Sequence, residues 1–461
     1  MPFAFHFYIN AKAQKTQSFS FFRTRKSQKK RNSFVHLVSS VFKITPLRLC
    51  VFAFEKEKSG KVEYFMRKIV LLAALLSIFN FQFSICQAQD EDSLRIGVKG
   101  FVDTYHAVRT EQPNDWMSSR TRVRGEMTLE KGNAGAFVSA NLMHNATLSD
   151  RTGFQLREAY GYYSDEHLDL RAGRQIIVWG VADALRLTDI ISPMDYTEFL
   201  AQDYDDIRIP VGGLRVRYSR EKWCLEAVAI PVSSFFELPT DAQNPWSVGA
   251  LTIAPEPSHR IYNMEYGGRL SFFLSGIDFS LSALHTWNKM PVMHNGIGEY
   301  KRMTMVGGDM SVSVGQFVVR SEVAEYIDEA QPTANTQHLS PSTQQRAAST
   351  NALVALDWYA GNDWSLSAQY AHKYVAKGKH RNTGLATFRV SKDLLHNTLA
   401  LQSFAYIDVT YGGIYNRLSA DYALNDQLHT TLGYDYFHAD RGTFMVYNDN
   451  SEIFLKLKYS F

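Results

Sequence analysis

Cysteine is scarce in this chain, which holds only three in 461 residues, Cys50, Cys86 and Cys224. Three cysteines at these spacings cannot form a disulfide framework, and they match no zinc or redox motif. Long apolar runs are missing after residue 88, where no segment approaches the roughly 20 residues of a membrane-spanning helix. Proline is infrequent, whereas 45% of the residues are hydrophobic and 21% are charged. This composition excludes a disordered or collagen-like chain.

Residues 66–88 have the plan of a cleaved secretory signal. Arg67 and Lys68 precede an apolar stretch, and Cys86 and Ala88 supply the small residues that flank a cleavage site. A membrane anchor is the alternative, but Asn80 interrupts the apolar run before it is long enough to span a bilayer. We therefore favour cleavage, with the exported protein comprising residues 89–461.

Residues 1–65 precede this signal and are basic, with clusters such as Arg23, Arg25 and Lys26 that would suit a nucleic-acid-binding arm. We prefer a start at Met66, with residues 1–65 untranslated or a disordered extension, because a secretory signal works from the N-terminus. The first 88 residues hold 15 of the 49 Lys and Arg and 3 of the 46 Asp and Glu, which leaves a net charge of −9 on residues 89–461. An acidic exported protein argues against nucleic acid as a partner.

Apolar and polar side chains alternate through most of residues 89–461. In the last segment one face carries Ile453, Leu455, Leu457, Tyr459 and Phe461, and the other carries Lys456, Lys458 and Ser460. The same period of two recurs in segments of about ten residues separated by turn or loop stretches. The sequence therefore predicts a nearly all-β chain.

A soluble sandwich would also alternate, so other features decide between the two folds. Long strands, aromatic residues near strand ends and charges on the polar face favour a transmembrane antiparallel β-barrel. The connections alternate between short ones (275–276, 360–363 and 425–426) and long ones (177–210, 232–259 and 329–349). At about 20 residues per strand and connection, the chain predicts 16–18 strands around a water-filled lumen, with long extracellular loops.

Two short segments carry a family resemblance. The terminal Phe461, with Tyr459 and Leu457 before it, resembles the C-terminal strand by which outer-membrane β-barrel proteins are recognised by their assembly machinery. Residues 170–180 (LRAGRQIIVWG) and 189–195 (DIISPMD) resemble a segment of porin-like families of otherwise uncharacterised outer-membrane proteins. The resemblance implies a multi-pass barrel in the outer membrane of a Gram-negative bacterium. Its implied partners are outer-membrane lipid and the assembly machinery, with Tyr459 and Phe461 as the assembly signal.

Two rows of arginine share one face of their predicted strands and are expected to line the pore. They are Arg120, Arg122, Arg124, Arg215 and Arg217. In a water-filled lumen such cations concentrate anions. The alternative is that they pair with inward carboxylates such as Glu126, Glu226 or Glu265 and brace the wall.

The connection 177–210 is long and rich in aspartate, and long loops in compact folds are often functional. We expect it to fold into the lumen and narrow the pore, because apolar residues such as Ile190 and Phe199 need a packing surface; an extracellular flap is the alternative. The residues of this candidate constriction are Arg174, Trp179, Asp183, Arg186, Asp189, Asp195, Asp203, Asp205 and Asp206.

The sequence predicts a passive porin-like channel for small hydrophilic solutes, anions among them if the arginine rows face open water. We expect no enzyme activity, metal or cofactor, because no phosphate loop or Gly-x-Ser-x-Gly elbow is present and the histidines are dispersed. A barrel without a transport role, as a surface adhesin or a hydrolase, is the alternative. His438 near Asp435 and Asp440 is the best triplet for hydrolysis. A homo-oligomer is compatible with this sequence.

Overall fold

The computed structural model describes residues 93–461, apart from 184, 204–205, 248, 250, 295, 333–343 and 377–381. The extension 1–65 and the signal 66–88 assigned above lie outside the described residues. No helix within the described part has the length and apolar character needed to cross a membrane.

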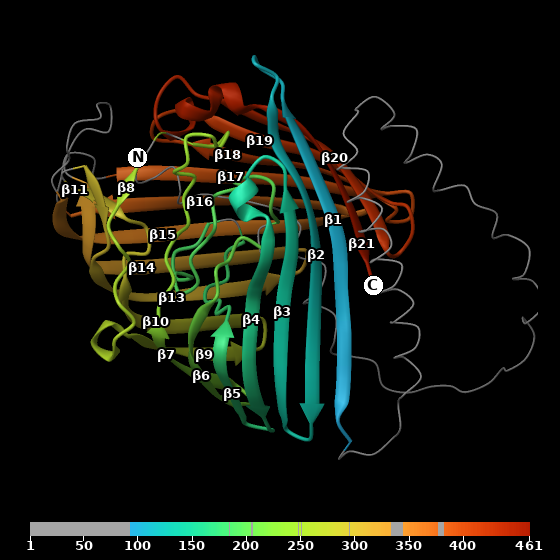
Figure 1. Cartoon of the computed structure of the whole chain (residues 1–461). Helices are drawn as coiled ribbons and strands as arrows, with labels where there is room; N and C mark the ends of the chain where they lie inside the picture. Colours follow the sequence, from blue (N-terminus) through green and yellow to red (C-terminus); the bar gives the residue numbers. More distant parts are fainter. Residues whose placement is uncertain are drawn as a thin grey trace, which may run out of the picture. The chain divides into compact units, whose positions relative to one another are not determined.

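In the described residues, eighteen antiparallel strands form one closed barrel (Figure 1). Each strand pairs with the next one in the ring, and β21 pairs with β1 to close it. The strands are β1 (Arg95–Arg109), β2 (Trp116–Lys131), β3 (Ala134–Asn145), β4 (Gly153–Ser164), β5 (Leu168–Gln175), β6 (Val211–Arg220), β7 (Trp223–Val232), β9 (Glu265–Leu274), β10 (Ile277–Trp287), β13 (Arg302–Val314), β14 (Phe317–Pro332), β15 (Gln344–Gly361), β16 (Trp364–Val375), β17 (Asn382–Leu394), β18 (Leu399–Asp408), β19 (Ile414–Ala423), β20 (Leu428–His438) and β21 (Glu452–Ser460). The predicted barrel of 16–18 strands is confirmed.

The remaining elements are short and lie in the connections. β8 (Thr252–Ile253), β11 (Val292–His294) and β12 (Ile297–Glu299) form a small separate sheet. The 3-10 helices are η1 (Ser149–Arg151), η2 (Ile261–Asn263) and η3 (Thr443–Asn450).

The alternation of the sequence sorts side chains between the two faces of the wall. On β21, Ile453 and Leu455 are 52% and 49% exposed. The residues that alternate with them, Phe454 and Lys456, are buried. Large exposed apolar side chains recur in this way around the barrel, as an outer face in contact with lipid requires. Buried arginines, aspartates and glutamates lie on the opposite, inward face.

One end of the barrel carries short turns and the other carries long connections. Turns at 132–133, 221–222 and 275–276 lie at the same end as the first described residues and Phe461, whereas 176–210 and 233–264 lie at the opposite end. The predicted loop 329–349 is wrong in its bounds, because β14 runs to Pro332 and β15 begins at Gln344. A bulge between Tyr326 and Glu329, with Asp328 at φ 63°, interrupts the alternation of apolar and polar residues. The end of β14 therefore could not be recognised as a strand from the sequence.

Phe461 lies at the seam where the barrel closes. Its backbone N–H and carbonyl both bond to Gly100 of β1, with N–O distances of 3.0 Å. A Cβ on Gly100 would lie 2.8 Å from the Phe461 ring and closer still to the Arg124 carbonyl, so only glycine fits beneath the ring. Of the predicted assembly residues, Tyr459 thus lies in the last strand and Phe461 directly follows it, beside the first strand.

The long connection 176–210 folds into the barrel and packs against its inner wall. Ile177, Leu185, Ile191 and Tyr196 are each fully buried and belong to one apolar cluster with wall residues such as Met305 of β13. Phe199 packs on Trp246 from the second long connection, with 4.9 Å between ring centroids. These apolar side chains therefore find their packing surface inside the barrel.

Candidate functional site

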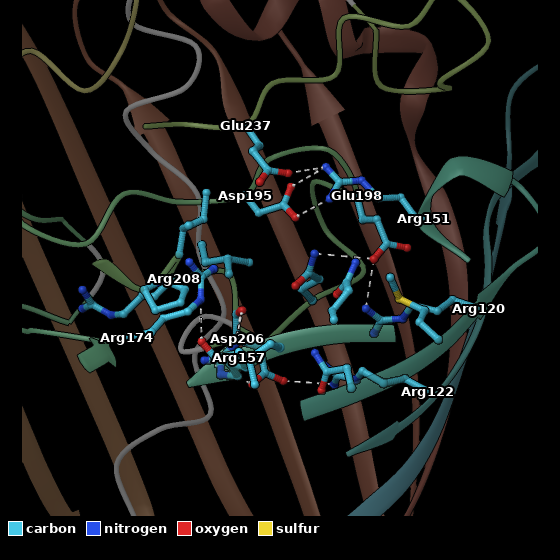
Figure 2. A pocket seen from close by; sticks show the side chains of 18 residues that line it. Arg120, Arg122, Arg151, Arg157, Arg174, Asp195, Glu198, Asp206, Arg208 and Glu237 are labelled. Atoms are coloured by element: carbon cyan, nitrogen blue, oxygen red, sulfur yellow. Dashed lines mark hydrogen bonds and ion pairs between the residues drawn. The ribbon is translucent and has the colours of Figure 1, made fainter. Parts of the chain in front are cut away.

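A charged cavity of about 310 Å³ lies between this inward loop and the wall formed by β2 to β5. Six arginines and four carboxylates line it (Figure 2). The arginines are Arg120, Arg122, Arg151, Arg157, Arg174 and Arg208, and the carboxylates are Asp195, Glu198, Asp206 and Glu237. The surplus of guanidinium groups makes the cavity suited to anions.

The predicted row on β2 is deeply buried, and two of its arginines, Arg120 and Arg122, line the cavity. Arg122 makes a two-pronged ion pair with Asp103 of β1, at 3.1 and 2.7 Å, and its Nη2 lies 3.0 Å from Asp206 of the loop. Arg124 also donates to Asp206, at 2.5 Å. These arginines therefore face inward as expected. Their guanidinium groups bind the inward loop through Asp206.

Arg120 secures a second point of the loop. Its Nη1 lies 3.1 Å from Glu198 Oε2, and its Nη2 donates to the Ala201 carbonyl at 2.9 Å. Asn145 of β3 donates to the other Glu198 oxygen at 2.6 Å. Arg417 of β19, on the other side of the seam between β21 and β1, donates to the Leu200 carbonyl at 3.1 Å.

The mouth of the cavity is less buried. Arg151 bridges Asp195 and Glu237, at 3.3 and 2.6 Å. Arg174 donates to the Arg157 carbonyl at 3.2 Å and is the last residue but one of β5, so it belongs to the wall and not to the loop in which we had placed it. In Figure 2, Arg174 and Arg208 lie across the cavity from Arg120 and Arg122.

The second predicted row lies outside this cavity. Arg215 and Arg217 both pair with Glu226 of β7, at 2.9 and 3.4 Å. Trp179 donates its indole N–H to the same carboxyl group at 2.7 Å. At these two arginines the geometry matches the bracing alternative, with Glu226 as the partner.

The aspartates of the loop do not gather into one acidic surface. Asp183 pairs with Arg320 of β14, and Asp203 pairs with Lys456 of β21. Asp189 lies 2.5 Å from Arg208 and 3.7 Å from Arg186, both within the loop. Asp205 lies outside the described residues. Asp189 thus pairs within the loop, whereas the other described aspartates of the candidate set fix the loop to cations of other elements: Asp183, Asp195, Asp203 and Asp206.

Asp206 is the most strongly anchored of these groups. Burial opposes its ionisation, but Arg122, Arg124 and Arg157 hold its pKa well below the usual value of 3.8. The pKa of Asp203 is also lowered, since Lys456 outweighs the effect of burial. The sequence could not show this, because the three arginines come from β2 and β4.

The lowered pKa of Asp206 gives a pH prediction. A carboxylate with a depressed folded pKa stabilises the fold above its unfolded pKa, and that contribution is lost only as pH falls through the folded value. We therefore expect the Asp206 carboxyl group to stay ionised from pH 7 to about pH 4. Infrared difference spectra between the wild type and Asp206→Asn across this range measure its protonation, and a protonation of Asp206 near pH 5 would contradict the anchoring.

Glu322 of β14 is an anchor that the sequence analysis missed. Its Oε1 accepts from the backbone N–H groups of Val181 and Ala182, at 2.7 and 2.8 Å. Its Oε2 accepts from the N–H groups of Leu187 and Thr188, both at 3.1 Å. Only its position between inward Arg320 and Ala324 could have suggested an inward role.

Two other candidate sites are not assembled. Asp435 is buried on the inward face, where it binds Arg417 and Tyr415, whereas His438 is exposed and stacks on Tyr436. The triplet with Asp440 is therefore not a hydrolytic site. Within the described part of the chain, no three His, Cys, Asp or Glu side chains are grouped as a metal site.

Comparison with known proteins agrees with this architecture. The family model described as "Protein of unknown function (DUF1302)" matches residues 106–461. No curated protein matches the chain.

Several solved structures are similar to the barrel. Pseudomonas aeruginosa OccK2 (OpdF), in complex with glucuronate, has a TM-score of 0.50 at 10% identity, covering 79% of this chain and 96% of its own. Acinetobacter baumannii OccAB3 has a TM-score of 0.47 at 11% identity, covering 79% of this chain and 99% of its own. The outer-membrane channel DcaP of the same organism has a TM-score of 0.42 at 11% identity, covering 81% and 99%. The likeness to OccK2 is one of fold: a porin-like outer-membrane barrel.

Proposed function

We propose a function for this chain, which belongs to the DUF1302 family of proteins of unknown function, from its own barrel and cavity. It is an outer-membrane channel for the passive diffusion of small hydrophilic organic anions. Residues 66–88 direct its export, and the last strand with Tyr459 and Phe461 is read by the barrel assembly machinery. Solutes move down their gradient, and no bond of the solute is made or broken.

The observation that carries this proposal is the arginine-rich cavity between the inward loop and the wall. An 18-stranded barrel is wide enough for water, so a loop that crosses it leaves a narrowed path. Guanidinium groups in such a path favour carboxylates, which they bind with two parallel hydrogen bonds. Arg174 is the best placed to meet a solute, because its side chain is half-buried at the mouth while Arg120 and Arg122 are engaged by the loop.

Single-channel recording tests the proposal. OccK2 is in complex with glucuronate, which makes this sugar acid a suitable first probe for a channel of the same fold. The wild-type protein should give discrete conductance steps in planar bilayers, and glucuronate should interrupt the current in a concentration-dependent way. A barrel that gives no steps would contradict channel function.

Arg174→Gln is expected to weaken the glucuronate effect about tenfold, the loss of one charge-assisted hydrogen bond. The concentration of glucuronate that halves the current measures this shift. Arg260→Gln is the matched control. Arg260 is exposed in the connection 233–264, so this substitution removes the same charge at a position away from the cavity. An equal shift in both variants would indicate a general effect of net charge and would contradict a binding role for Arg174.

A further inference from the structure

The wall of the barrel is incomplete beside the cavity. β4 begins at Gly153, but its pairing with β5 begins only at Ala159, which lies opposite Arg174. β5 ends at Gln175, opposite Val211 at the start of β6. Residues 153–158 of β4 therefore have no partner strand on that side, and β5 ends well below the upper ends of β3 and β4 (Figure 1).

Side chains and not backbone pairs fill this gap. Arg174 Nε donates to the Arg157 carbonyl at 3.2 Å, and Glu158 accepts from the Ile176 N–H at 2.8 Å. Arg157 reaches the loop, where it donates to the Asp206 carbonyl at 2.7 Å. A wall closed by side chains opens at lower cost than one closed by a ladder of backbone hydrogen bonds, since rotamers change without loss of strand pairing.

Residues from both edges of this gap line the cavity. Gln155, Leu156 and Arg157 line it from the unpaired edge of β4, and Ile209 and Pro210 line it from the side of β6. Leu156 is an outward side chain, 42% exposed, on the same face as Phe154, which is 71% exposed. The lining of the cavity therefore includes an outward position of the wall, Leu156, as well as the inward Arg120 and Arg122.

We propose that this gap is a side opening that binds an amphipathic anion, an organic acid with an apolar tail. The proposal rests on the anion channel proposed above and names a further class of solute for the same cavity. The acid group lies against Arg157 and Arg174, and the tail passes between Leu156 and Pro210 toward the lipid. Such a solute would otherwise have to cross a charged lumen with its tail in water, which is unfavourable.

Photolabelling of the full-length protein in lipid nanodiscs tests the opening. The probe is a C12 carboxylic acid with a diazirine in its chain, and the matched probe carries a neutral primary amide in place of the acid. We expect the acid to label peptides containing Leu156 and Pro210 several-fold more than the amide does. Equal labelling by both probes, or labelling spread evenly over the outer face, would overturn the proposal.

The acid group of a free solute and the phosphate group of a lipid are both anions attached to an apolar tail. A separate comparison is therefore needed to show which of the two the gap binds. A diazirine-bearing phosphatidic acid serves as the lipid probe in the same nanodiscs. Labelling of Leu156 and Pro210 by the free acid supports passage of a solute. Labelling by the phosphatidic acid alone would overturn it, because the gap would then hold a resident lipid.

Leu156→Trp separates this proposal from the channel itself. The indole fills the gap from the outer face, so uptake of the C12 acid into proteoliposomes should fall several-fold more than uptake of glucuronate does. An equal fall for both solutes would mean that the indole narrows the shared cavity, and it would overturn the side opening. Leu142→Trp is the control, because Leu142 is an outward residue of β3, 51% exposed, and does not line the cavity. Unchanged uptake of the C12 acid in Leu156→Trp would overturn the side opening, whereas a wild-type protein that takes up neither solute would contradict the channel.

Discussion

Replacement of residues 181–208 by a short Gly-Ser linker is expected to raise single-channel conductance at least about twofold, since current through a pore follows its narrowest section. This segment crosses the lumen from Glu322 on β14 to the arginines of β2. The strands pair with each other around the whole ring without it, so the barrel should still close. Bilayer recordings in potassium chloride, with and without the segment, measure the change.

The control for this deletion is a segment of the other long connection. Residues 256–260 are mostly exposed, and their replacement by the same linker should leave conductance unchanged. If the deletion of 181–208 also leaves conductance unchanged, the loop does not narrow the conducting path. If both variants fail to assemble, heat-dependent mobility on gels will show the loss of the folded barrel.

The barrel could be predicted because its rule is local. Lipid outside and polar groups inside impose a period of two on each strand, and residues 453–461 show that period without knowledge of any neighbour. The even strand number follows from the expectation that the first and the last strand have their free ends on the same, periplasmic, side. The family suggested by residues 170–180 and 189–195, an uncharacterised porin-like one, was likewise confirmed by the family match and by the barrel fold.

The partners inside the barrel could not be predicted, because alternation gives the face of a residue but not what lies across the lumen. Arg122 meets Asp206 and Arg417 meets Leu200 through a loop whose path has no sequence period. The apolar residues of that loop predicted only that it would need a packing surface. The gap beside β4 was also hidden, since residues 153–158 alternate like any paired strand and only the early end of β5 leaves them without a partner.

Glu322→Gln is expected to release the first part of the loop. The carboxylate accepts hydrogen bonds from four backbone N–H groups, two on each oxygen. The amide of glutamine has one oxygen, which can accept from two of these N–H groups, and its NH2 group would face the other two N–H groups, which would lose their acceptor. A buried N–H without an acceptor costs about 1–3 kcal/mol, so two such groups destabilise the anchored state strongly. We expect rapid current fluctuations in bilayers and about tenfold faster tryptic cleavage at Arg186, as the anchored fraction of the loop falls.

Two further variants make this test specific to the anchor. Glu325→Gln changes the same residue type on the same strand, but Glu325 lies on the outward side, where it accepts from the Thr350 hydroxyl at 2.7 Å, so this variant should behave as wild type. Gly180→Ala should reproduce the fluctuations while Glu322 keeps its charge, because Gly180 has φ +89° and a Cβ there would lie 2.6 Å from Glu322 Oε1 and displace the loop. If Glu322→Gln fluctuates and Gly180→Ala does not, the effect comes from the lost charge in the lumen and not from release of the loop. Quiet currents in both variants would mean that the ion pairs of Asp206 and Glu198 hold the loop without Glu322.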